Sequence, residues 1–175
     1  MARLGHLTRR FFGSLRPGGP PRSEQEWAES QLLPGERQIW CALSGPDRRH
    51  SAAVARRVES TLGPSTTRPV LAAALLHDSG KAVSGLRTPG RVVATILAAT
   101  SIRTDDDAMR WERSGSRWRR SMGAYRRHPV LGADMLCDIG SDPLTVAWTR
   151  EHHLPPDRWT IDRTIATALH EADDD

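Results

Sequence analysis

The chain has 175 residues, of which 38% are hydrophobic and 26% are charged, the usual balance of a soluble globular protein. It contains no apolar run of about eighteen residues and no apolar stretch before a small-residue cleavage site, which argues against a membrane span and a secretory signal. The net charge of +4 favours anionic partners such as phosphate esters, nucleic acid or an acidic membrane surface. Cys41 and Cys137 form no CxxC pair, so we expect a cytoplasmic location.

The N-terminal residues 3–16 have the pattern of a basic amphipathic helix. Its apolar residues at helical spacing are Leu4, Leu7, Phe11 and Leu15. Such a helix can contact an acidic membrane or a protein partner, or it can pack on its own domain. The residues "PGGPP" at 17–21 are typical of a linker. We therefore divide the chain into a basic tail with linker, residues 1–22, and a helical domain, residues 23–175.

The helical domain shows helical periodicity nearly throughout, without the alternating patterns or Asn-Gly turns of strands. Ser23 with Glu26 resembles a capping box, and Asp47 is placed to cap a long helix. Further helices are expected to start near Pro34, Arg68, Gly90, His128, Pro143 and Asp162. The run "RPVLAAALLHD" is apolar nearly all round, as a central buried helix should be, and Gly80 follows as a stop signal. The sequence predicts an all-α, compact multi-helix bundle.

A polar segment precedes His128 and is rich in arginine. Seven arginines lie between Arg110 and Arg127, and aromatic residues are interleaved with them. As a lid, the segment would grip a polyphosphate and stack on a base, with Arg126 and Arg127 binding phosphate. The alternative is a solvated polar loop whose tryptophans pack on the core. No nucleic-acid-reading motif is present, which argues against a nucleic-acid partner.

Five of the seven histidines fall on inward helix faces or at helix ends, where side chains from different helices meet. They are His50, His77, His128, His152 and His153. One such histidine is more often a core residue than a metal ligand, but here Asp78 follows His77 at the end of the most apolar helix. A buried charge is unfavourable unless it is paired or bound to a metal. Because helical bundles build metal sites from inward-projecting side chains, the set predicts a metal site.

The order of these motifs resembles the HD superfamily of metal-dependent phosphohydrolases. "HDSGK" at 77–81 is similar to its HDxGK motif, and "HPVLGADML" at 128–136 is similar to its HPxxGxxxL helix. "ALHEADDD" at 168–175 resembles the helix that carries the last ligand. The residues after His153 lack the glutamate and the Gly-Tyr-Pro motif of the cyclic-dinucleotide branch. The resemblance therefore points to small stand-alone bacterial members with an HD-type helical bundle.

The resemblance also implies a site with two divalent ions, Fe, Mn, Zn or similar. His50, His77 and Asp173 would hold one ion, His128, His152 and His153 the other, and Asp78 would bridge them. Asp174 is an alternative to Asp173. Asp78 and Lys81 would be catalytic, with Lys81 binding a substrate phosphate as a compact point charge. Lys81 is the only lysine beside 24 arginines, and its alternative role is that of a solvated surface residue.

The expected function is a metal-dependent phosphohydrolase that cleaves a phosphate ester or anhydride. The substrate would be a phosphorylated small molecule, with a nucleotide favoured, and a metal-bound hydroxide would be the nucleophile. The alternative is a catalytically weak or inactive module that uses the same site to sense a nucleotide or metal, or to bind a partner. Release of phosphate distinguishes the two.

Overall fold

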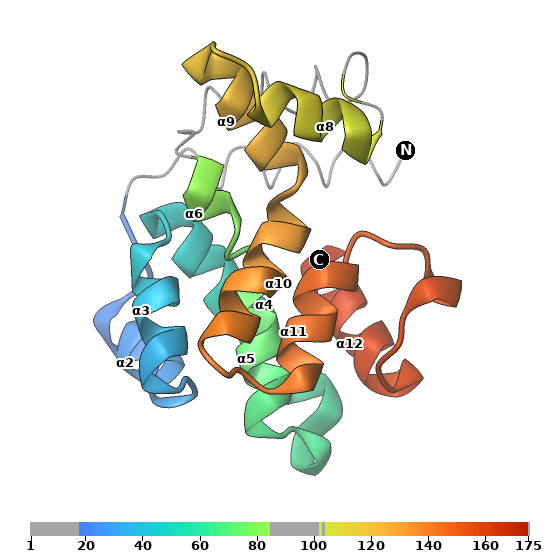
Figure 1. Cartoon of the computed structure of the whole chain (residues 1–175). Helices are drawn as coiled ribbons and strands as arrows, with labels where there is room; N and C mark the ends of the chain where they lie inside the picture. The colour runs from blue at the N-terminus through green and yellow to red at the C-terminus, as the bar shows by residue number, and fades with distance from the viewer. Residues whose placement is uncertain (1–17, 85–101, 103, 175) are drawn as a thin grey trace, which may run out of the picture.

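The computed structural model describes residues 18–84, 102 and 104–174. Within these ranges the regular secondary structure is helical and no strand occurs, which confirms the all-α prediction. Figure 1 shows the helices gathered into a bundle. The predicted tail helix at 3–16 and most of the helix predicted from Gly90 lie outside the described residues. None of the described helices combines the length and the apolar character that crossing a bilayer requires.

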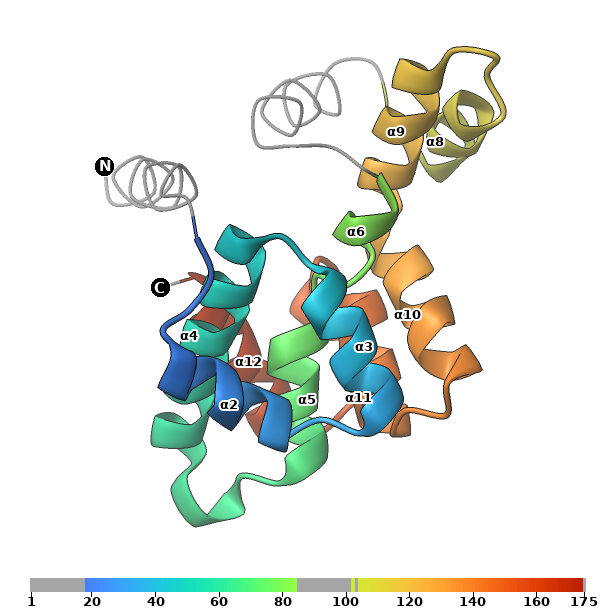
Figure 2. The same cartoon turned by 90° about the vertical axis from the view of Figure 1, so that its left-hand side faces the viewer.

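Helix α5 (Arg68–Leu76) is the centre of the bundle. Its residues from Val70 to Leu76 are all buried, which explains why the sequence is apolar on every side of this helix. It contacts α3 (Pro34–Ala42), α4 (Gly45–Leu62) and α11 (Pro143–Glu151). Figure 2 shows α5 enclosed by these neighbours. The C-terminal end of α5 therefore lies inside the molecule.

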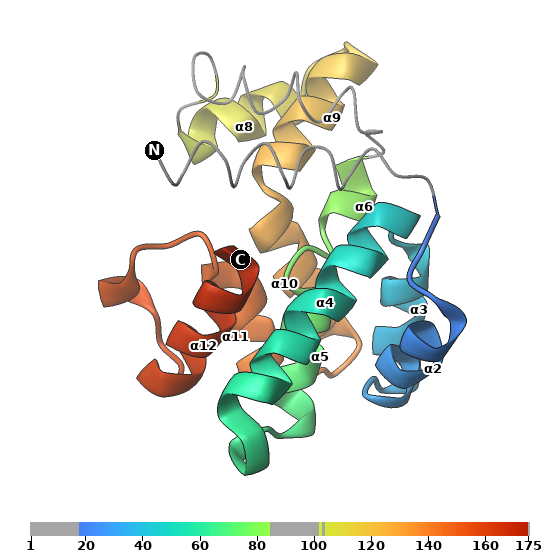
Figure 3. The ribbon, with the colours of Figure 1, turned by 180° about the vertical axis from the view of Figure 1, so that it is seen from behind.

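The other described elements flank α5 or extend the bundle beyond it. They are α2 (Arg22–Ser30), η1 (Gly63–Ser65), α6 (Lys81–Ser84), α8 (Asp105–Glu112), α9 (Arg117–Arg126), α10 (His128–Asp138), η2 (Pro156–Arg158) and α12 (Arg163–Asp174). Helix α10 packs against α11, and α12 packs against α4, as Figure 3 shows from behind. The C-terminal helix is thus brought back to the long helix near the start of the domain.

Two predicted helix caps are wrong. Helix α2 has no side-chain cap, so Ser23 and Glu26 form no capping box; Glu26 instead accepts a hydrogen bond from Arg22. The N-cap of α4 is Ser44, whose hydroxyl accepts from the backbone N–H of Asp47 at 3.4 Å. Asp47 lies in the first turn, where a carboxylate interacts favourably with the helix dipole. Both errors concern the exact start of a helix whose existence was predicted.

The arginine-rich segment is a helical hairpin of α8 and α9, so the alternative of a solvated polar loop is wrong. Thr104 and Asp107 cap α8 reciprocally, each backbone N–H donating to the other side chain, at 3.2 and 3.1 Å. The two helices enclose an apolar cluster of Ile102, Ala108 and Met122, with Trp111 and Tyr125 packed against it. Trp118 remains 47% exposed. Figure 2 shows the hairpin beside α6, which contacts α9.

Candidate metal centre

The turn that follows α5 brings two ionisable side chains into the interior. His77 is the C-cap of α5, and both His77 and Asp78 are buried. The backbone N–H of Lys81 donates to the carbonyl oxygen of Asp78 at 2.9 Å and closes the turn. Because α5 is central, a residue at this end cannot reach water as an ordinary helix end does.

Two glycines allow this turn to lie directly against α10. A Cβ atom on Gly80 would overlap the backbone carbonyl oxygen of His128, and one on Gly132 would lie 2.7 Å from Ser79 Oγ. The close approach leaves Oδ1 of Asp78 only 3.2 Å from Nε2 of His128. The glycines of the two motifs therefore have a packing role that brings an acid and an imidazole together.

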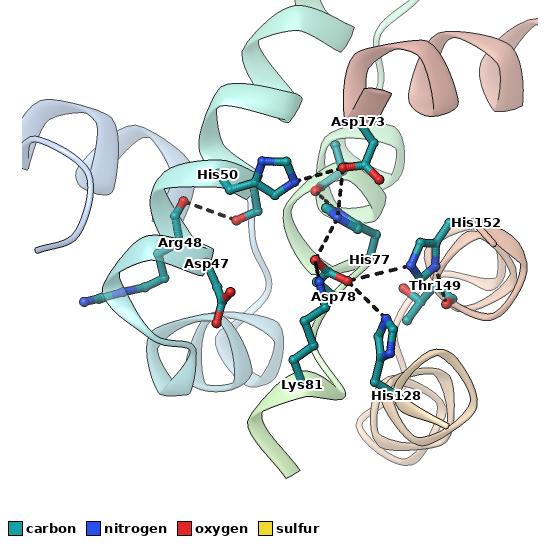
Figure 4. A network of polar contacts seen from close by, with 12 residues as sticks. Asp47, Arg48, His50, His77, Asp78, Lys81, His128, Thr149, His152 and Asp173 are labelled. Atoms are coloured by element: carbon teal, nitrogen blue, oxygen red, sulfur yellow. Dashed lines mark hydrogen bonds and ion pairs between the residues drawn. The ribbon is translucent and has the colours of Figure 1, made fainter. Parts of the chain in front are cut away.

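Three buried imidazoles are oriented in the same way, as Figure 4 shows in part. In each ring Nδ1–H donates to the backbone carbonyl oxygen three residues earlier. The donors are His77, His128 and His152, and the acceptors are Ala74, Tyr125 and Thr149, at 2.9, 2.8 and 2.9 Å. Because a carbonyl oxygen only accepts, the proton is on Nδ1 and Nε2 faces the site. Metal-binding histidines are commonly oriented by such a bond.

Asp78 lies between these Nε2 atoms. Its Oδ1 is 3.2 Å from His128 and 3.7 Å from His152, and its Oδ2 is 3.3 Å from His77. Oδ1 and the Nε2 atoms of His128 and His152 are buried and have no hydrogen-bond partner within the described residues, whereas Nε2 of His77 lies within ion-pair distance of Asp78 and Asp173. His153 lies at the exposed side, with its ring centre 5.2 Å from that of His128. Asp78, His128, His152 and His153, the Asp78 group, have ligand atoms within 4.8 Å of one another.

The second set of ligand atoms, the Asp173 group, consists of His50, His77 and Asp173, which also lie within 4.8 Å of one another. Oδ1 of Asp173 is 2.8 Å from Nε2 of His50 and 3.6 Å from Nε2 of His77. Asp174 is exposed and lies 3.6 Å from His170 instead. The structure thus brings together all seven predicted ligands, and it favours Asp173 over Asp174 for the last position.

The carboxylates and the burial of the site act in opposite directions on the histidines. Burial favours neutral His77, but Asp78 and Asp173 outweigh it and raise the pKa of His77 to about 9. For His50 and His128 burial prevails, and it lowers the pKa of both rings. The metal-free site therefore contains a protonated His77 beside the neutral imidazoles of His50 and His128.

Lys81 lies beside Asp78, and its Nζ donates to Oδ2 of that carboxylate. Burial opposes both charges, but the pair holds the pKa of Asp78 well below its usual value and raises that of Lys81. Figure 4 also draws Asp47 of α4 in the polar network, and the ring centre of Tyr125 lies 5.8 Å from that of His128. Sequence patterns indicated Asp47 only as a helix cap and Tyr125 only as one aromatic residue among arginines, so their place near the site was missed.

The two arginines predicted to bind phosphate lie where α9 ends. Arg127 forms an ion pair with Glu112 of α8, and a phosphate would compete with that carboxylate. Arg126 is half-buried in the last turn of α9. Phosphate binding by these two residues stays a prediction.

The residues present fit a metal ion. Imidazole nitrogens together with carboxylate oxygens are ligands that suit Zn, Mn, Fe and similar divalent ions. The Nε2 atoms of His128 and His152 and Oδ1 of Asp78 have no hydrogen-bond partner within the described part of the chain, and a cation would satisfy them. The site can therefore hold metal ions. Comparisons of the chain with family models, with curated proteins and with solved structures found no match.

Proposed function

We propose that the protein is a metal-dependent phosphohydrolase of the HD superfamily, whose motifs it resembles. One observation carries the proposal: buried, Nδ1-anchored imidazoles direct bare Nε2 atoms at the carboxylate of Asp78. A lone pair that faces a carboxylate oxygen is repelled, and a buried polar atom without a partner costs about 1–3 kcal/mol. A divalent cation between them turns this repulsion into coordination, so the arrangement supports a metal site.

The two groups of ligand atoms support a pair of ions. Asp78 directs Oδ2 toward His77 of the Asp173 group and Oδ1 toward His128 of its own group. Its carboxylate is thus suited to bridge two cations, which we take to be Fe, Mn, Zn or similar. Bound ions supply the Lewis acidity that activates water and polarises a phosphoryl oxygen at neutral pH.

Lys81 supports an anionic substrate. Its side chain is 18% exposed, so its charge is partly accessible while it contacts Asp78. A compact ammonium group suits a phosphoryl oxygen, and it would offset charge that develops during phosphate transfer. We favour a nucleotide because the arginine-rich helix α9 contacts α6 and carries Tyr125, whose ring centre lies 5.8 Å from that of His128.

The test combines metal analysis with a phosphate-release screen over nucleotides and other phosphate esters. We expect about two divalent ions per chain in the active protein. Asp78→Ala should lose metal and should lower the activity by at least about 100-fold. This is the upper end of the loss caused by removing a group that only orients a ligand, and Asp78 is itself a proposed ligand. Asp134→Ala is the matched control, because Asp134 is an exposed residue of α10 that pairs with Arg150; it should change neither quantity.

The outcomes separate the candidate functions. A wild-type protein that binds metal but releases no more phosphate than Asp78→Ala from any ester would rule out the hydrolase. The sensing or partner-binding module would then be favoured. A protein that binds no divalent ion under any condition would exclude the metal site itself.

A further inference from the structure

Asp173 lies in the last turn of α12, which ends at Asp174. The last carbonyl groups of a helix have no partner within the helix, and such turns fray unless other groups bind them. Asp173 is nevertheless only 18% exposed and contacts His50 at 2.8 Å. A group outside α12 must therefore hold this turn.

The guanidinium group of Arg57 on α4 binds the turn that carries Asp173. Its Nε and Nη2 both donate to the backbone carbonyl oxygen of Ala172, at 2.9 and 2.6 Å. The positive charge also lies at the C-terminal end of α12, where the helix dipole favours a cation. Ala172 is buried and directly precedes Asp173. Fixing this carbonyl limits the rotation of the backbone from which the Asp173 side chain projects.

Helix α4 carries both a ligand and this anchor. His50 and Arg57 are about two helical turns apart, so they lie on the same face of the helix. That face is the one that packs against α12. One rigid element therefore supplies His50 and also sets the position of Asp173 relative to it.

We infer that Arg57 is a positioning residue for the ion held by the Asp173 group. This inference rests on the proposed metal site. The two hydrogen bonds of Arg57 to the carbonyl oxygen of Ala172 fix the backbone that carries Asp173, so Arg57 acts through the orientation of Asp173. The ligands of the Asp78 group come from the turn after α5, from α10 and from the end of α11, whereas the hydrogen bonds of Arg57 to Ala172 are directed to α12, so we expect the Asp78 group to be insensitive to Arg57.

Arg56 provides a matched control. It is adjacent to Arg57 on α4, but it pairs with Glu24 and Glu59 and lies 3.4 Å from the ring centre of Trp27. These contacts are directed to α2 and to α4 itself, away from α12. Arg56→Ala therefore removes an arginine and its ion pairs from the same helix without releasing Asp173.

The experiment titrates Mn²⁺ or Zn²⁺ into metal-free wild type, Arg57→Ala, Arg57→Lys and Arg56→Ala. We expect Arg57→Ala to weaken one binding step by about 10–100-fold, as for loss of a group that orients a ligand, and to leave the other step unchanged. Arg57→Lys should recover part of the loss, since an ammonium group can still donate to the carbonyl oxygen. Arg56→Ala should bind both ions as wild type does.

Two further measurements distinguish positioning from a general loss of stability. Amide hydrogen exchange in the last turn of α12 should accelerate in metal-free Arg57→Ala and not in Arg56→Ala. In an Asp173→Ala background, Arg57→Ala should cause no further loss of affinity, because the residue that it positions is gone.

The results separate the inference from the proposed function. If Arg57→Ala binds both ions with wild-type affinity, or lowers affinity equally in the Asp173→Ala background, the positioning role is wrong and the hydrolase proposal stands. A wild-type protein that binds no divalent ion would overturn the proposed function and the inference with it.

Discussion

At the scale of single residues, the site depends on which ring nitrogen of each histidine is already bound. His77, His128 and His152 each use Nδ1 within their own chain segment and present Nε2 to the site. In the metal-free protein, the carboxylates of Asp78 and Asp173 stabilise a proton on Nε2 of His77. A metal ion and a proton therefore compete for the same nitrogen.

Metal binding to the Asp173 group should release a proton at neutral pH. With a pKa of about 9, His77 is protonated at pH 7.5, and it must lose that proton to bind metal. We expect release of about one proton for the ion bound by the Asp173 group. The affinity for this ion should fall about tenfold for each pH unit below that pKa. Isothermal titration calorimetry in two buffers of different ionisation enthalpy measures this release. Equal heats in both buffers would contradict the prediction.

The candidate ligands were predictable because each lies at a helix end or on an inward face, which sequence periodicity indicates. The order of His50, the His77–Asp78 pair and His128 carried most of that information. The contact between Lys81 and Asp78 depends on side-chain conformation, which no pattern reveals. Arg57 was also missed, because its partner is a backbone carbonyl oxygen 115 residues away and it is one of 24 arginines.

At the scale of elements, the approach of the turn after α5 to the start of α10 positions Asp78. Gly80 makes that approach possible because it has no Cβ atom to meet the carbonyl oxygen of His128. The turn and α10 come from different parts of the chain, so the position of Asp78 relative to His128 depends on how closely these two elements pack.

Gly80→Ala should separate these two elements. The added methyl group overlaps backbone atoms that cannot move aside, so we expect a loss of about 1–3 kcal/mol in the free energy of unfolding and weaker metal binding. Urea denaturation of the metal-free proteins and metal titration measure the two effects. The control is Gly115→Ala in the α8–α9 connection, where a Cβ atom meets nothing within 4 Å. Wild-type stability of Gly80→Ala would show that the contact is not tight.

Helices that supply many apolar residues to the core were easier to predict from the sequence than helices that supply few. Helix α5 was evident because every residue from Val70 to Leu76 is buried and apolar. Helices α8 and α9 were missed because they are polar and pack mainly on a small cluster of their own. The start of α4 was predicted three residues too late because Ser44 and Asp47 are both good capping residues, and only the structure shows that Ser44 is the cap.

At the scale of the whole molecule, the site joins distant parts of the chain. His50 and Asp173 are 123 residues apart in sequence and come from helices α4 and α12. An ion bound by both closes a long loop in the native state, and the unfolded chain does not offer this set of ligands together. Metal binding should therefore stabilise the fold as a whole.

Removal of metal should lower the melting temperature. An ion present at about 100 times its dissociation constant adds about 2.7 kcal/mol, which for a chain of this size corresponds to roughly 5–10 °C. Calorimetry of the wild type with Mn²⁺ and with a chelator measures the shift. Asp78→Ala should melt at nearly the same temperature in both conditions. A wild-type protein with no shift would show that metal does not bind the native state preferentially.

The connection between the hairpin and the rest of the molecule has a mechanical consequence. Arg127 alone separates α9 from α10, since it is the C-cap of one and the N-cap of the other. Tyr125, which holds the ring of His128 through its carbonyl oxygen, also packs on the hairpin cluster. We therefore expect a change in the tilt of the hairpin to change the direction of the His128 ring. A molecule bound at the exposed Trp118 should alter the orientation of this buried imidazole.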